Sequence, residues 1–332
     1  MSADIALRAE KALCHRLAQQ KSADIAPRAE EALCHRLVQQ KSADIALRAE
    51  KALCHRLAQQ KERVMWLAAM QLISGRTWQD NRERIAAELA SLPGERPLLV
   101  LLPENFALFG ERQGYLDGAE PLGNGPIQQQ LSDWAKSHGI WLVAGAMPTA
   151  IAGADHIHTS TLVFDPDGEL KGHYHKIHLF DVDVADNHGR YRESETFSPG
   201  DQPVLVDSPF GPLGLSICYD LRFPELYRQL ARAGARVLLV PAAFTAVTGE
   251  AHWEPLLRAR AIENQCYVVA ANQGGTHETG RQTWGHSMVI DPWGRVLACR
   301  ASGQGTVLAP LDGALIDELK RTMPVLQHAR LL

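Results

Sequence analysis

The sequence predicts an α/β domain preceded by a repetitive extension. From residue 64 onward, apolar segments typical of buried strands alternate with amphipathic segments typical of helices. Two similar strand-turn-strand segments, at residues 161–176 and 286–300, indicate a body with two related halves. Such alternation produces a sheet covered by helices. We therefore expect the domain to occupy residues 62–332 and the extension to occupy residues 1–61.

The extension consists of three near-identical copies of one 20-residue segment. The copies cover residues 2–21, 22–41 and 42–61, with changes only at Pro27, Glu31 and Val38. Their Ala, Leu, Arg, Glu, Lys and Gln content favours helix. Because a 20-residue period rotates each apolar stripe by about 200°, one continuous rod is disfavoured. We expect three short helices or a partly disordered tail.

Composition and charge narrow the class of protein. The chain is 45% hydrophobic and 22% charged, as soluble globular proteins are. It has no apolar run of about 18 residues and no signal-peptide core after Met1, so we expect a cytoplasmic protein without a membrane partner. The extension carries +4 and the whole chain −4, which leaves −8 on the domain. An acidic domain without a basic stripe argues against a nucleic-acid partner.

The six cysteines do not form a disulfide framework. Three of them, Cys14, Cys34 and Cys54, are copies of one repeat position. The others, Cys218, Cys266 and Cys299, lack CxxC spacing, which favours a reducing compartment. We expect Cys266 and Cys299 to lie in the core. The Cys-His pairs of the repeats are adjacent residues, which do not share a helix face, so we expect no metal there.

The elements of the domain follow in order. Buried strands are expected at residues 64–72, 97–104, 140–147, 211–218, 236–244 and 266–273. Helices are expected at residues 78–92, 127–138, 224–234 and 252–265. Gly139 should end the second helix, and Pro224 and Pro255 should lie early in the third and fourth. The turns DPDG and DPWG of the two similar segments suit type I turns.

Cys218 lies between a predicted strand and a predicted helix. A nucleophile on such a sharp turn is exposed at the sheet edge, and the N–H of Tyr219 after it can point at a developing oxyanion. Cysteine reactivity also needs a lowered thiol pKa or a nearby base. From this segment alone, a buried and inert cysteine is an equal alternative.

Glu104 and Lys176 are charged residues that follow predicted strands. Glu104 follows an apolar run and a proline, where a carboxylate is costly unless it is paired or functional. Lys176 follows a strand, although a surface lysine whose stem covers apolar residues is the common alternative. Glu104 and Cys218 both fall where strands end, the usual edge for a site in an open α/β sheet.

We expect neither a metal nor a cofactor. His173, His175 and His178 have spacings that suit a metal, but no acid or cysteine accompanies them nearby in sequence. The GNGP segment at residues 123–126 lacks the GxGxxG of a dinucleotide loop.

Three segments together resemble a known family. LLPENF, HKIHLFD, and SICYDLRFPEL with VLLVPAAF are similar to the signature segments of the nitrilase superfamily of carbon-nitrogen hydrolases. The resemblance spans nearly all of the chain after the repeats. It implies a four-layer αββα sandwich and a catalytic triad of Glu104, Lys176 and Cys218, with Glu193 as a supporting glutamate. The tract from AHWEPLLRARAIENQ to WGHSMVIDPWG resembles the amidase branch that includes deaminated glutathione amidase and omega-amidase.

The resemblance implies a thiol-dependent, cofactor-free amidase, with a homodimer as the default assembly. It would hydrolyse a small carboxylate-bearing amide to acid plus ammonia through a cysteine thioester. Deaminated glutathione is the first substrate, and 2-oxo-acid amides such as alpha-ketoglutaramate are the second. A nitrilase or carbamoylase would use the same triad, and a non-catalytic scaffold is the alternative of a different class.

Several further side chains are candidates for the pocket. Phe244, Thr248 and His252 are expected to bind substrate, although short aromatic segments more often serve packing. Arg222 is expected to order the turn after Cys218 rather than to touch substrate.

Overall fold

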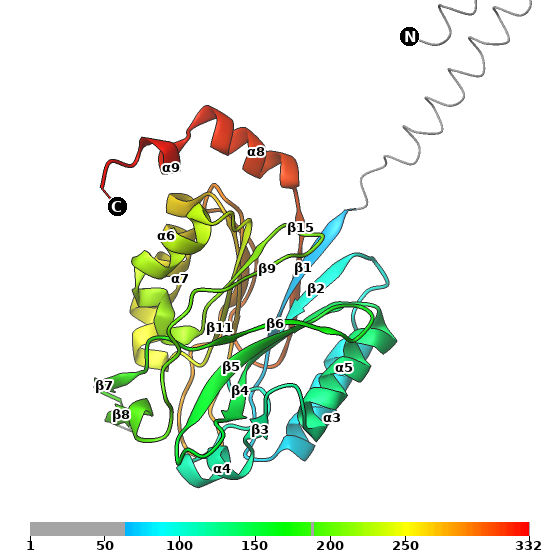
Figure 1. The fold of residues 1–332 in the computed structure, drawn as a ribbon, viewed down its shortest axis with the longest axis vertical. Coiled ribbons are helices and arrows are strands. Elements are labelled where there is room, and N and C mark those ends of the chain that lie inside the picture. The colour runs from blue at the N-terminus through cyan, green and yellow to red at the C-terminus, as the bar shows by residue number, and fades with distance from the viewer. Residues whose placement is uncertain (1–63, 187–188, 332) are drawn as a thin grey trace, which may run out of the picture. The chain divides into compact units, whose positions relative to one another are not determined.

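The computed structural model describes residues 64–186 and 189–331. The three repeats lie outside the described residues, and so do the expectations of short helices and of no metal site in them. Figure 1 shows the arrangement of the helices and strands from residue 64 onward. In this part of the chain, no helix is both long and apolar enough to cross a membrane.

The first sheet has seven strands, six of which form a continuous path. In spatial order these are β15 (Gly305–Leu311), β1 (Met65–Gln71), β2 (Leu98–Leu101), β4 (Trp141–Ala150), β5 (Ile157–Phe164) and β6 (Leu170–His175). The short β3 (Glu120–Pro121) pairs with β4. The central strands β1, β2 and β4 are parallel, and the strands at the two edges run antiparallel to their neighbours.

The second sheet has six strands. In spatial order these are β14 (Val296–Arg300), β13 (Ser287–Ile290), β12 (Tyr267–Asn272), β11 (Val237–Ala242), β10 (Leu213–Leu215) and β9 (Leu205–Val206). Here too the central strands β10, β11 and β12 are parallel. Each half of the domain therefore builds a parallel centre flanked by antiparallel strands.

The strand β1 shows why its sheet is covered on both faces. Leu67 and Ala69 belong to the core shared with the second sheet, whereas Ala68 and Met70 belong to the core under the helices. Successive side chains of a strand point to opposite faces, so a continuous apolar run requires cover on both sides.

Four layers result, as the resemblance implied. Helices α3 (Trp78–Ala90) and α5 (Pro126–His138) pack on the outer face of the first sheet. Helices α6 (Pro224–Arg232) and α7 (Ala246–Asn264) pack on the outer face of the second, so the order is αββα (Figure 1). Further short elements include α4 (Arg112–Asp117), a hairpin of β7 (Asp181–Asp183) and β8 (Arg190–Arg192), and the turn η1 (Glu193–Glu195).

The two similar hairpins use the same turn. Asp165 Oδ1 accepts hydrogen bonds from the backbone N–H groups two and four residues later, at 3.0 and 2.9 Å. Asp291 Oδ1 does the same at 2.9 Å for both. Gly168 and Gly294 close the turns with φ of 81° and 86°, which glycine adopts without strain.

Three expectations about the elements were wrong. Helix α7 begins at Ala246 rather than residue 252, because the Thr245 side chain accepts the Thr248 N–H and caps it there. Pro255 consequently lies inside the helix. Cys299 is exposed on the edge strand β14, whereas Cys266 is buried as expected. Strand β10 ends at Leu215, before Cys218.

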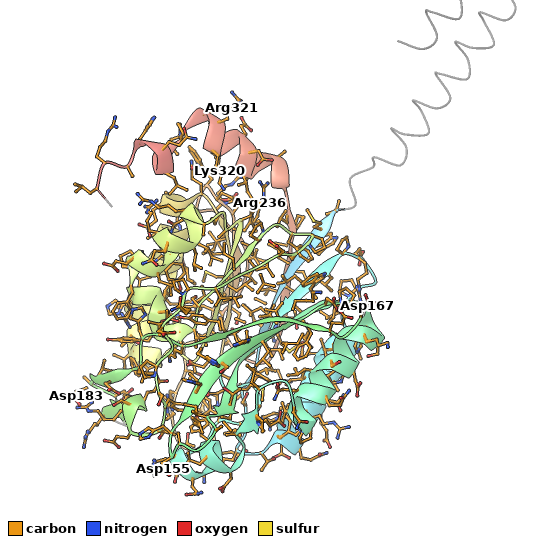
Figure 2. The ribbon with its side chains drawn as sticks, viewed as in Figure 1. Asp155, Asp167, Asp183, Arg236, Lys320 and Arg321 are labelled. Atoms are coloured by element: carbon orange, nitrogen blue, oxygen red, sulfur yellow. The ribbon has the colours of Figure 1, made fainter. Side chains whose placement is uncertain are left out.

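The carboxyl-terminal elements were not predicted. After β15, Asp312 accepts backbone N–H groups at the start of α8 (Gly313–Thr322), and the short α9 (Val325–His328) follows. Arg236 Nη1 lies 2.6 Å from Asp317 Oδ1 of α8. Figure 2 shows Arg236 close to helix α8. These contacts hold α8 against the second sheet.

Candidate active site

Glu104 is a buried carboxylate that belongs to one sheet and is held by the other. It follows β2 and is 4% exposed. Its Oε2 accepts the N–H of Ala243, just after β11, at 2.9 Å. Its backbone carbonyl accepts Gln273 Nε2, just after β12, at 2.9 Å. The carboxylate is thus fixed where the ends of parallel strands from both sheets meet.

Gly145 allows the segment before Glu104 to run close to β4. A Cβ at this position would clash with the backbone oxygens of Leu102 and Pro103. Any larger residue would displace the backbone that leads into Glu104.

Lys176 is a buried cation between two carboxylates. Its side chain is 1% exposed, and Nζ lies 2.9 Å from Glu104 Oε1 and 2.8 Å from Glu193 Oε1. Glu193 Oε2 in turn accepts the N–H of Phe180 at 2.7 Å. Burial acts to lower the pKa of Lys176, but the two carboxylates outweigh it and hold that pKa well above its usual value. The ammonium therefore stays charged at neutral pH.

For Glu193, burial outweighs the effect of the neighbouring cation on the pKa. Burial raises the pKa of Glu193, Lys176 acts to lower it, and the nearby Glu104 raises it again. One cation shared between two buried carboxylates cannot fully compensate both.

Cys218 starts the short turn η2 (Cys218–Arg222) that leads from β10 to α6. Its φ of 49° lies in the left-handed region, which a residue with a side chain adopts only where the surroundings enforce it. The residue is 8% exposed. Burial, and then the charge and hydrogen bond of Glu104, raise the pKa of Cys218 well above its usual value, against the effect of Lys176. At neutral pH the resting group is a thiol beside a base.

Asp220 ties the cysteine turn to the lysine segment. Its carboxylate is fully buried, and Oδ2 accepts the N–H of Ile217 at 2.8 Å and the hydroxyl of Tyr174 at 2.7 Å. Oδ1 accepts the N–H of His178 at 3.0 Å and lies 2.7 Å from its Nδ1. Tyr174 and His178 stand two residues before and two residues after the buried lysine, so this one carboxylate sets the spacing between lysine and cysteine.

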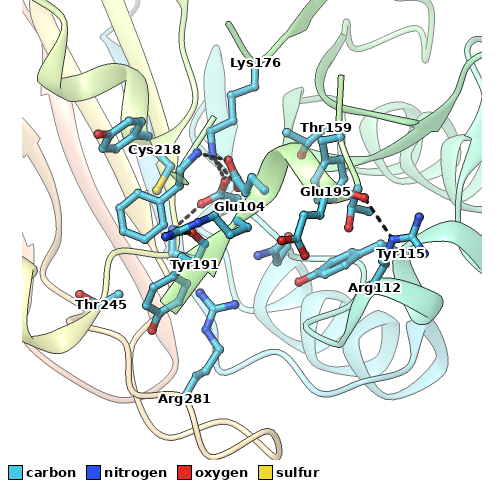
Figure 3. Close-up of a pocket in the computed structure, with 18 of the residues that line it drawn as sticks. Glu104, Arg112, Tyr115, Thr159, Lys176, Tyr191, Glu195, Cys218, Thr245 and Arg281 are labelled. Carbon is cyan, nitrogen blue, oxygen red and sulfur yellow. Dashed lines mark hydrogen bonds and ion pairs between the residues drawn. The ribbon is translucent and has the colours of Figure 1, made fainter. Parts of the chain in front are cut away.

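These groups face a pocket of about 390 Å³ (Figure 3). Glu104, Lys176, Glu193 and Cys218 all line it, as do Tyr219, Phe244 and Thr248. His252 does not line the pocket; its Nδ1 lies 3.1 Å from Nη1 of Arg222, which does. Five arginines surround the pocket: Arg112, Arg190, Arg192, Arg222 and Arg281.

Residues 63–321 match the family model of carbon-nitrogen hydrolases. The chain belongs to the carbon-nitrogen hydrolase family. Deaminated glutathione amidase of Yersinia enterocolitica is 46% identical to this hydrolase over 265 residues, which cover 80% of this chain and 92% of that protein. The enzyme therefore hydrolyses carbon-nitrogen bonds in non-peptide amides.

Solved structures with the same fold include two that bear on the hydrolase. Nit3 of Saccharomyces cerevisiae, a member of branch 10 of the nitrilase superfamily, is 32% identical with a TM-score of 0.71, covering 81% of this chain and 97% of that one. A mutant of the amidase from Nesterenkonia sp. AN1 carries the acetamide moiety of fluoroacetamide on its active site cysteine. It is 26% identical with a TM-score of 0.66, covering 82% of this chain and 98% of that one.

The histidines near Lys176 have separate structural partners in the hydrolase. His178 contacts Asp220, whereas His175 Nδ1 lies 2.7 Å from Ser160 Oγ and stacks on His158 at 4.1 Å. Within residues 64–186 and 189–331, no three His, Cys, Asp or Glu side chains are grouped to hold a metal ion.

Some residues of the site were not identified from the sequence. Asp220 carries the same signal as Glu104, a charge within an apolar segment, and was identifiable on that ground. Gln273 gives a weaker signal, a buried amide after an apolar strand. Arg222, which was expected only to order its turn, lines the pocket, and Arg281 lies in a loop that carries no local signal.

Proposed function

We propose that this hydrolase is an amidase that forms a thioester on Cys218. Glu104 acts as general base and acid, Lys176 and the Tyr219 N–H bind the oxyanion, and Glu193 positions Lys176. The observation that carries the proposal is the buried Lys176 Nζ, 2.9 and 2.8 Å from two carboxylates and beside a thiol on a strained turn.

In acylation, Glu104 accepts the Cys218 proton and the sulfur attacks the amide carbonyl carbon. The C–S bond forms as the carbonyl electron pair moves to oxygen, where Lys176 donates a charged hydrogen bond. One such donor is worth about 3 to 4 kcal/mol in other acyl-transfer enzymes. Collapse breaks the C–N bond as Glu104 returns the proton to nitrogen, so the amine leaves and the thioester remains.

In deacylation, Glu104 accepts a proton from water, whose oxygen attacks the thioester carbonyl. The C–S bond then breaks, and the sulfur regains its proton from Glu104. The net reaction is amide plus water to acid plus amine. Lys176 keeps its proton throughout, as its raised pKa favours, so Glu104 alone transfers protons.

The arginines of the pocket support a substrate that carries carboxylates. The Arg222 guanidinium lies over the rings of Phe244 and Tyr219, 5.2 and 5.8 Å from their centroids, at the end of the turn that Cys218 begins. Its planar fork suits a carboxylate on the acyl side of the amide. Together with the names of the relatives, this favours deaminated glutathione as substrate, ahead of alpha-ketoglutaramate. Deaminated glutathione contains only secondary amides, so its hydrolysis releases an amine in place of ammonia.

The substrate proposal is tested with a matched pair of amides. Deaminated glutathione and alpha-ketoglutaramate share the 2-oxoglutaryl acyl group, so released 2-oxoglutarate measures both. We expect kcat/KM to be at least about tenfold higher for deaminated glutathione, because a larger leaving group adds contacts in the pocket. Faster turnover of alpha-ketoglutaramate would reverse the order of substrates. Preference for a nitrile or an N-carbamoyl compound would overturn the amidase proposal.

We further infer a cytoplasmic homodimer that binds no nucleic acid. The three cysteines of the described part of the chain are all free, and a reducing compartment keeps such thiols, including a catalytic one, reduced. The homodimer rests on the family resemblance, and light scattering of the purified protein measures it directly.

We also propose that residues 62–332 alone form the enzyme. The groups of the proposed mechanism all lie between Glu104 and Tyr219, far from the repeats in sequence. A chain that begins at Arg63 should fold, keep its thermal midpoint within a few degrees and retain kcat/KM within about twofold. Circular dichroism and the 2-oxoglutarate assay check this. Loss of fold or turnover on truncation would make the repeats part of the working enzyme.

A further inference from the structure

Arg281 is a second cation in the pocket, separate from Arg222. It lies in the loop after β12, and its guanidinium is 4.7 Å from the ring centroid of Phe109 and 5.0 Å from that of Tyr191. Arg222 instead lies over Tyr219 and Phe244. The two arginines therefore share no aromatic neighbour and mark two different parts of one pocket. Figure 3 shows Arg281 pointing from its loop into the pocket beneath Tyr191.

The guanidinium of Arg281 has donors left for a ligand. The Tyr191 hydroxyl donates to Asp186 Oδ2 at 2.8 Å and accepts a hydrogen bond from Arg281. None of the ion pairs among the described residues involves Arg281. By contrast, Arg190 and Arg192, also at the pocket, pair with Glu195 and Asp183. A half-buried, ring-stacked guanidinium that has no acidic partner within residues 64–186 and 189–331 is suited to a planar anion.

The loop holds Arg281 in place before any ligand arrives. His277 is 4% exposed and stacks on Phe109, whose ring also contacts Arg281, with the His277 and Phe109 ring centroids 3.8 Å apart. Its Nδ1 lies 2.9 Å from Ser74 O and its Nε2 2.9 Å from Thr283 Oγ1. The His277 N–H also donates to Arg281 O at 2.9 Å. A cation fixed in this way loses little conformational entropy when it binds an anion.

We propose that Arg281 binds a carboxylate on the leaving-group side of the scissile amide. Arg222 would hold the acyl-side carboxylate, and Cys218 attacks the carbonyl between them. The preferred substrates are thus N-acylated amino acids or dipeptides with a free carboxyl terminus. This inference rests on the proposed amidase function and adds the selection of the leaving group to it.

The test compares Arg281→Gln with the unchanged enzyme on two substrates. Both are 2-oxoglutaryl amides of one dipeptide, ending in a free carboxylate or in a carboxamide. The unchanged enzyme should prefer the carboxylate by about 10- to 100-fold in kcat/KM, mainly through KM, the range for a charged hydrogen bond. Arg281→Gln should abolish this preference and leave the carboxamide substrate within about twofold.

Gln282→Ala is the matched control, because Gln282 is the exposed neighbour of Arg281 in the same loop. It should retain the full preference for the carboxylate. Equal turnover of both substrates by the unchanged enzyme, or an equal loss on both in Arg281→Gln, would overturn the inference while leaving the amidase function in place. An enzyme that hydrolyses neither substrate, nor alpha-ketoglutaramate, would overturn the amidase function itself.

Discussion

Replacing Cys218 with alanine should reduce amide hydrolysis by at least about 10⁴-fold, because the thioester cannot form without the sulfur. The folded state should change little. The residue is 8% exposed, at the wall of the pocket, and alanine meets the same backbone restriction as cysteine at the φ of 49°. The 2-oxoglutarate assay measures turnover, and thermal unfolding measures the fold.

Alkylation of the unchanged enzyme tests whether turnover is lost because the Cys218 thiol is missing or because the substitution disturbs the structure. It also tests the alternative of a non-catalytic scaffold. Iodoacetamide at neutral pH should modify Cys218 stoichiometrically in the unchanged enzyme and abolish turnover, with peptide mass mapping to locate the label. Cys266→Ala is the control, since Cys266 is buried but does not line the pocket. It should keep kcat. Full turnover in Cys218→Ala would refute the mechanism, and an unreactive Cys218 together with no turnover would favour the scaffold.

Replacing Lys176 with methionine should impair both turnover and stability. Loss of one oxyanion donor lowers kcat by about 10² to 10³-fold. Methionine fills the volume but leaves Glu104 and Glu193 buried without their cation, which costs about 3 to 5 kcal/mol of unfolding free energy. Urea unfolding and the 2-oxoglutarate assay measure the two effects.

The stability effect of Lys176→Met has a defined pH dependence. The pKa of Lys176 is higher in the folded state than in the unfolded state, where it is about 10.4. Lys176 therefore stabilises the fold fully at any pH below about 10.4. This stabilisation is lost only as the pH rises through the higher folded-state pKa. In the variant Glu193 loses the cation that acts to lower its pKa, so the pKa of Glu193, already raised by burial, rises further. The destabilisation should therefore be large at pH 8 and smaller at pH 5, where one carboxylate takes up a proton.

Lys171→Met provides the matched lysine control. Lys171 lies on the strand that leads to Lys176, its side chain is 40% exposed, and its Nζ is 3.7 and 3.6 Å from Asp165 and Glu169. Replacing Lys171 should lower the free energy of unfolding by less than about 1 kcal/mol. A second variant, Lys176→Met with Glu193→Gln, should recover part of the stability without recovering turnover. Equal stability of Lys176→Met and the unchanged enzyme at pH 8 would contradict the buried-pair account.

The sequence predicted the central strands because each is buried on both faces and reads as an apolar run. It did not predict β15, where Gly305 and Pro310 interrupt the apolar pattern. Proline is tolerated there because β15 is an edge strand. The start of α7 was misplaced for another reason. The cap at Thr245 is local and was identifiable from the sequence, whereas the close contact of Gly249 with Trp284 depends on tertiary structure.

The residues of the candidate site likewise divide into those that the sequence could predict and those that it could not. Glu104 was detectable because a carboxylate after an apolar run is costly unless it is paired. Lys176 gave only a moderate signal after its strand, and the family resemblance joined both residues to Cys218. Arg281 was not detectable, because its place depends on the rings of Phe109 and Tyr191, which are distant in the chain. His252 was placed at the pocket, but it lies on α7 against Arg222.

The hydrogen bond from the Ala243 N–H to Glu104 crosses from one sheet to the other. Glu104, the proposed general base, is therefore positioned correctly only when the two sheets pack against each other with one particular offset. Substitutions between the sheets that preserve folding but shift this offset would be removed by selection on catalysis. The two halves are thereby constrained to change together, whereas a substitution of Arg281, which takes no part in this hydrogen bond, can change which amides are accepted without moving Glu104.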